Sequence, residues 1–283
     1  TPDGVIFYDN GNVVAQVVWH ELTPHPVVWL AAVNGCGQVD TTNLGGEALL
    51  LERLDLARLQ AELIAERGEL AAGVAGLGEA VARLGELHLA IAELGAEGYV
   101  KVTPPGSHWK DGFLIARPVA EAECVVSTCC LKTHQYGGVF TMSLKNSVGT
   151  VPRKGTTLMR ELHASPDQRR MIAEINTAYK PAVIVVDGLV AFVDEGPMTG
   201  PRKDAGLFLA GTDRVAVDAV GVAILKELGS NDTIMKPAVF AQEQIARAVE
   251  LGLGVSSAAD IVIATPDAAS EAYAEKIRKI LSA

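Results

Sequence analysis

The sequence predicts an α/β protein with a mixed, mainly parallel sheet, helices on both faces of that sheet, and a helical Ala/Leu-rich N-terminal region. Three observations predict this class. Hydrophobic residues make up 49% and charged residues 20% of the 283 residues, which suffices for a sizeable core. From residue 99 onward, short β-like runs alternate with helical patterns. Residues 182–186 consist of an alanine followed by four β-branched residues, as in a strand buried on both faces.

The chain divides into a predicted N-terminal region, residues 1–98, and a predicted α/β domain, residues 99–283. In the first, residues 13–19 and 27–33 are rich in Val and predict strands. The second of these runs could equally be helical, because periodicity does not separate the two structures at this length.

Two amphipathic helices are predicted over residues 47–67 and 79–94, where Leu, Ile and Val recur near 3.6-residue spacing around a Gly-rich break. Their apolar stripe is expected to pack either inside the protein or against a partner helix. A homo-oligomer formed through residues 47–94 is therefore one expectation.

The α/β domain is predicted to alternate strands with helices. Pro166 and Ser165 suggest the start of one helix, and Asp213 or Thr212 suits the N-cap of another. The predicted strands are 99–102, 113–116, 123–128, 182–186, 207–210 and 261–264, and the predicted helices are 167–179, 214–228, 237–251 and one from 268.

Composition excludes several function classes. The net charge is −10, from 24 basic and 34 acidic residues, and aromatics are only 5%, so no nucleic-acid partner is expected. No apolar run reaches the roughly 18 residues of a membrane span, so no membrane association is expected. The default compartment is the cytoplasm; export after loss of an N-terminal signal is the alternative, because the chain begins at Thr1.

The four cysteines do not have the spacing of an iron–sulfur site, so no such cluster is expected. They are Cys36, Cys124, Cys129 and Cys130, and buried thiols are the simplest interpretation. Cys129 and Cys130 are adjacent in a predicted strand, so their side chains should point to opposite faces.

Two polar motifs embedded in apolar sequence predict the functional site. They are the run Leu-Lys-Thr-His at 131–134 and the run Ser-Leu-Lys-Asn at 143–146. Lysines supply point charges, and hydroxyls and amides supply directional hydrogen bonds, as an anion site requires. A solvated loop with two surface lysines is the alternative. We expect His134 to act as acid/base and the anion to be bound by Lys132, Thr133, Ser143, Lys145 and Asn146.

Several acids could complete such a site. Asp187 ends a predicted strand, and Asp194 and Glu195 follow in a Gly/Pro-rich loop, so these three are candidate ligands of a divalent metal ion. Alternatively, Asp187 caps a turn beside two solvated acids. Asp218 lies in an apolar helix and is expected to be buried and paired with a lysine or with backbone N–H groups, or to share a metal. A catalytic role with His134 and Asp187 and a structural role are equally consistent with the sequence around Asp218.

Residues 124–254 resemble a widespread prokaryotic family known as domain of unknown function 362. The two motifs above carry the resemblance, together with Val-Asp-Gly at 186–188, Glu-Gly-Pro at 195–197 and Gly-Thr-Asp at 211–213. The chain departs from the family pattern at Cys129 and Cys130, where Pro and Lys are favoured, and at Arg214, where Pro is favoured. Some members carry a ferredoxin-like module, whose cysteines this chain lacks. The resemblance supplies a fold expectation and little about function.

The sequence leaves three hypotheses open. The first is an enzyme that acts on a small anionic molecule through a Lys/His/Asp site, with help from a divalent metal ion as one option. The second is a non-catalytic accessory protein that binds a metal or a cofactor. The third is an oligomeric assembly protein. The identity of any cofactor is unknown at this stage.

Overall fold

A computed structural model describes residues 4–9, 12–18, 27–32, 94 and 96–283 of the chain. The helix predicted at 47–67 and, except for Leu94, the helix predicted at 79–94 lie outside these residues, as does Cys36. Of the described helices, none is long and apolar enough to cross a membrane.

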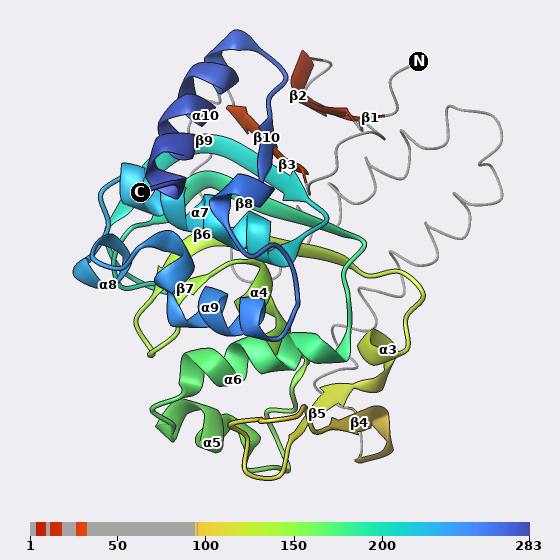
Figure 1. The fold of residues 1–283 in the computed structure, drawn as a ribbon. Coiled ribbons are helices and arrows are strands. Elements are labelled where there is room, and N and C mark those ends of the chain that lie inside the picture. The colour runs from red at the N-terminus through yellow and green to blue at the C-terminus, as the bar shows by residue number, and fades with distance from the viewer. Residues whose placement is uncertain (1–3, 10–11, 19–26, 33–93, 95) are drawn as a thin grey trace, which may run out of the picture.

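The centre of the fold is a six-stranded sheet in the order β10-β3-β9-β8-β6-β7 (Figure 1). This confirms the α/β class and a mixed sheet. The sheet is not mainly parallel, however: β10/β3 and β6/β8 are parallel, whereas the other three neighbouring pairs are antiparallel. The chain reverses direction between β8 and β9 and between β6 and β7, which makes these two pairs antiparallel. The strands are β3 (Val27–Ala32), β6 (Val126–His134), β7 (Val139–Thr141), β8 (Val183–Phe192), β9 (Arg202–Gly211) and β10 (Val262–Ala264).

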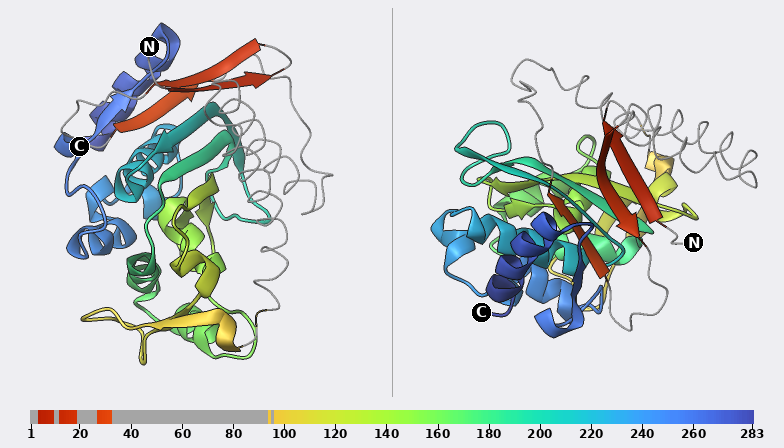
Figure 2. Two further views of the ribbon diagram at one scale, coloured as in Figure 1. Left: turned by 90° about the vertical axis from the view of Figure 1, so that its right-hand side faces the viewer. Right: turned by 90° about the horizontal axis from the view of Figure 1, so that it is seen from above.

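Helices α7 (Arg214–Glu227) and α10 (Ala268–Leu281) pack on one face of this sheet, and Figures 1 and 2 show them on the same side. As predicted, Asp213 caps α7, and its carboxylate accepts from the N–H groups of Val215 and Ala216. The side chains of α7 interlock with the inward residues of the strands, including Leu131, Val186 and Leu209, to form the main core.

A second, smaller core lies below the sheet in Figure 1. It is built from Trp109, Phe113 and Met171 among others, and each of these side chains is nearly or fully buried. Its elements are β4 (Tyr99–Val102), β5 (Phe113–Ala116), α5 (Leu158–Ala164) and α6 (Gln168–Ile175).

The remaining elements are short or lie at the edges of these cores. β1 and β2 form a hairpin of their own. They are β1 (Gly4–Asp9), β2 (Asn12–Val18), α3 (Arg117–Ala120), α4 (Ser143–Asn146), α8 (Asp232–Met235), α9 (Glu243–Glu250) and 3-10 turns at Ala96–Gly98, Ser147–Thr150, Asn176–Ala178, Val239–Ala241 and Ala258–Asp260.

Strand β6 differs from its prediction in a way that matters for the site. The predicted strand stopped at residue 128, but β6 continues to His134 because Lys132, Thr133 and His134 pair with β7. The polar motif at 131–134 therefore lies within a strand, and its side chains alternate between the two faces of the sheet.

Candidate functional site

The residues of β6 alternate between buried and half-buried positions. Leu131 and Thr133 are buried, and Leu131 packs in the core with α7. Lys132 and His134 are half-buried and point to the opposite face, since successive side chains of a strand alternate. The strand thus separates the motif into two structural residues and two residues that a ligand can reach. Cys129 and Cys130 divide in the same way, as predicted.

Lys145 is brought to this place by the short helix α4, which follows β7 directly. The buried carboxylate of Asp218 accepts hydrogen bonds from the backbone N–H groups of Ser143 (2.7 Å) and Leu144 (3.1 Å). The Asn146 amide donates to the Thr128 carbonyl at 3.1 Å and so ties α4 to β6. These contacts fix the helix that carries Lys145.

Gly138 is where Lys145 and His134 meet. A Cβ atom at this buried position would clash with Cε of Lys145 and would lie 3.4 Å from Nδ1 of His134. The Lys145 side chain therefore lies against the backbone at Gly138, and a side chain at this position would force Lys145 to shift.

The electrostatics of the three side chains show how crowded the positive charge is. Burial, and then repulsion from Lys145, Lys132 and His163, lowers the pKa of His134 to about 3. Burial, and then repulsion from Lys132 and Arg153, lowers the pKa of Lys145 to about 8. We refer to Lys132, His134 and Lys145 as the cationic cluster.

Within the described part of the chain, no carboxylate forms an ion pair with Lys132 or Lys145. Nδ1 of His134 is buried and has no hydrogen-bond partner there. Buried polar groups normally have partners, so an incomplete set of this kind is typical of a site that a ligand or water completes.

The loop after β8 packs against the end of β6. The backbone N–H of Gln135 donates to the carbonyl of Gly196 at 3.2 Å. Gly196 has φ +69°, and a Cβ there would lie 2.6 Å from the Thr133 carbonyl, so this approach needs glycine. The motifs at 131–134, 143–146 and 195–197 therefore lie next to one another.

Other residues predicted to bind substrate are committed to hydrogen bonds within the protein. The Thr133 hydroxyl is buried and donates to the Phe192 carbonyl at 3.2 Å. Ser143 is buried at the start of α4. Their role as ligand contacts stays a prediction, and their observed contacts hold β6 and α4 in place.

The predicted acids are spread over the structure. Asp187 pairs in register with Cys130 across the parallel β6/β8 ladder, which places it on the same face as Lys132. Its carboxylate accepts from the Leu189 N–H at 3.0 Å. Asp194 accepts instead from the Glu195 N–H and from the Asn231 amide, both at 2.8 Å.

The predicted metal ligands Asp187, Asp194 and Glu195 do not gather into one group. Among the described residues, no three His, Cys, Asp or Glu side chains are arranged to hold a metal ion. The reason is that Asp187 lies within β8, whereas Asp194 and Glu195 lie in the loop beyond its end, where Asp194 is bound to Asn231.

Asp218 matches its predicted environment. It is fully buried and bound by backbone N–H groups, as one of the predicted alternatives had it. Burial raises its pKa to about 7, while the N–H groups of Leu144 and Ser143 oppose the shift. Asp218 affects the cationic cluster through α4. It binds the backbone at the start of this helix and so positions Lys145.

Sequence reasoning missed Gly138 and Arg153 as parts of this site. Arg153 follows Pro152 at the turn after α4, and nothing in its neighbours signalled that its charge would act on Lys145. The charge of His163, on α5, acts on His134.

Comparison with known proteins adds a family and a relative. The model of the family described as "Domain of unknown function (DUF362)" matches residues 62–223, more than half of the chain. The chain is 30% identical over 155 residues to the thylakoid-associated protein sll1697 of Synechocystis sp.. That alignment covers 53% of this chain and 46% of the relative, so the chain spans about half of the relative's length. No solved structure matches the chain.

Proposed function

Because the chain belongs to the DUF362 family, whose description assigns no activity, we propose its function from the site: it is an enzyme that binds a small phosphate- or carboxylate-bearing molecule at the cationic cluster. The observation that carries this proposal is the gathering of Lys132, His134 and Lys145 without a carboxylate partner in the described part of the chain. An anion would relieve the repulsion that, together with burial, lowers the pKa values of His134 and Lys145.

The three side chains would have different roles. Lys132 would supply a fixed positive charge. His134, with a pKa of about 3, is neutral near pH 7 and would donate or accept a hydrogen bond rather than a charge. This makes it a weak base, so the pKa values favour Lys145 over His134 as the group that transfers a proton.

Lys145 suits proton transfer because its pKa of about 8 is close to physiological pH. Such a lysine exists in both protonation states, and it can therefore give a proton to a bound substrate and take one back. Perturbed lysines of this kind are frequent at active sites, although structural sites also contain them.

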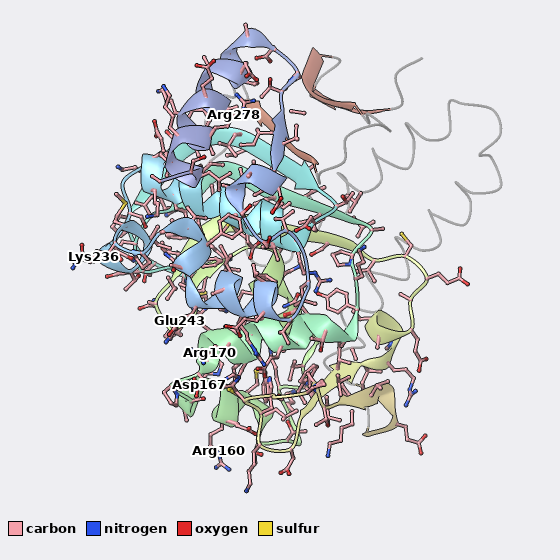
Figure 3. All side chains as sticks on the ribbon, viewed as in Figure 1. Arg160, Asp167, Arg170, Lys236, Glu243 and Arg278 are labelled. Carbon is pink, nitrogen blue, oxygen red and sulfur yellow. The ribbon has the colours of Figure 1, made fainter. Side chains whose placement is uncertain are left out.

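Isothermal titration calorimetry with inorganic phosphate and with acetate tests the proposal. We expect Lys132→Met and Lys145→Met each to lower the affinity of the bound anion by about tenfold or more, the loss of a charge-assisted hydrogen bond. The matched control is Lys236→Met, an exposed lysine that follows α8 and pairs with Asp232 (Figure 3). If neither anion binds the wild-type protein, or if the control loses as much affinity, the proposal is wrong.

A further inference from the structure

The loop that joins β6 to β7, residues 135–138, holds an exposed aromatic ring beside the cationic cluster. Tyr136 is 55% exposed, and its ring meets that of His134 edge to face, with centroids 5.6 Å apart and an interplanar angle of 71°. Edge-to-face contact is a favoured geometry for aromatic pairs, so the Tyr136 ring has a defined position relative to the site.

The backbone of this loop is anchored on three sides. The buried Gln168 donates its amide to the Tyr136 carbonyl at 3.0 Å, and Arg169 donates to the Gly137 carbonyl at 3.1 Å. The Gln135 N–H donates to Gly196 at 3.2 Å. A ring presented on so fixed a backbone loses little conformational entropy when it contacts a ligand.

Two exposed apolar side chains lie on the segments that meet at this loop. Among the described residues, six large apolar side chains are exposed, and the two most exposed are Met198 (79%) and Tyr136. They lie on the two segments that the Gln135–Gly196 hydrogen bond joins. A site for an inorganic anion alone has no use for an apolar rim, whereas an organic anion would cover it.

We infer that the ligand of this protein is an aromatic anion, whose phosphate or carboxylate group binds at Lys132, His134 and Lys145 while its ring packs on Tyr136. This inference rests on the proposed function and narrows it to a substrate class. Tyr136 is then the residue that determines specificity, and it takes no part in proton transfer.

The test compares phenyl phosphate with methyl phosphate, and benzoate with acetate, by titration calorimetry. In the wild-type protein we expect the aromatic member of the pair that binds to be about fivefold tighter, the effect of one aromatic contact. Tyr136→Ala should reduce this preference to about one, and Tyr136→Phe should retain it, because the ring is kept. Val126→Ala, at the exposed start of β6, is the control that should retain the preference.

Two results would overturn the inference and leave the proposed function standing: equal affinity of the wild-type protein for the aromatic and non-aromatic anions, or loss of both affinities to the same extent in Tyr136→Ala. Failure of every anion to bind the wild-type protein would overturn both. Thermal melts of each variant ensure that the compared proteins are folded.

Discussion

The charged side chains of Glu174 and Lys145 differ in the partners that surround them. Glu174 is fully buried and accepts five hydrogen bonds, from Ser107, from the backbone and ring of His108, and from two nitrogens of Arg247. Lys145 has like charges around it and, in the described part of the chain, no carboxylate partner.

This difference in partners distinguishes a charged residue that stabilises the fold, Glu174, from one that we propose binds a ligand, Lys145. The Glu174 network joins the segment before β5 to α6 and α9, three elements distant in the sequence. The cationic cluster holds nothing together by itself, and its mutual repulsion works against folding. A protein retains such a cluster at a cost in stability when function requires it.

Removal of the Glu174 carboxylate should have the largest effect. Glu174→Ala leaves Arg247 and the His108 N–H without their buried partner, and we expect a loss of about 3–5 kcal/mol in the free energy of unfolding, measured by urea denaturation. The control is Glu243→Ala, which removes a partly exposed partner of Arg169 at the start of α9 (Figure 3) and should cost under about 1 kcal/mol. Equal losses in the two variants would contradict the comparison.

The pH dependence of stability should show the burial of Asp218. Its folded pKa of about 7 lies above its ordinary value of 3.8, so the folded state binds the proton more tightly and stability falls as pH rises from about 4 to 7. The slope reaches up to about 1.4 kcal/mol per pH unit and should be absent in Asp218→Asn. Denaturation of both proteins at several pH values measures it; parallel profiles would show that Asp218 does not titrate in this range.

Replacement of Lys145 should stabilise the protein. Below pH 8 the half-buried lysine is held protonated among like charges, so Lys145→Met should raise the free energy of unfolding by about 1–2 kcal/mol. The gain should shrink as pH rises above 8, where the folded wild-type protein releases this proton. Lys236→Met, the exposed control, should change stability by less than about 0.5 kcal/mol. A destabilised Lys145→Met protein would mean that the cluster supports the fold.

Much of the fold followed from local sequence. The β-branched run at 182–186 and the Asp213 cap of α7 were recognisable because burial and capping leave short-range signals. The antiparallel return of β9 was not, since strand direction depends on connections that periodicity does not encode. The extension of β6 through Lys132 and His134 was missed because polar residues in a strand resemble a loop.

The sequence identified the two lysines of the site, but it did not identify the contacts around them. Lys132 and Lys145 stood out as charges within apolar sequence, but the approach of Lys145 to His134 beside Gly138 is specified only by the three-dimensional structure. Tyr136, placed by the anchored loop, gave no signal in the sequence. Asp187 and Asp194 looked like one acidic group because they are close along the chain, yet β8 carries them apart.

The titration of the Lys145 amine tests the central claim most directly. Selective NMR observation of this side chain, assigned with Lys145→Met, should give a pKa of about 8 in the ligand-free protein. Saturating phosphate or acetate, whichever binds, should raise it by one unit or more, because the anion stabilises the protonated form. A pKa near the ordinary lysine value of 10.5 that no anion changes would contradict the account.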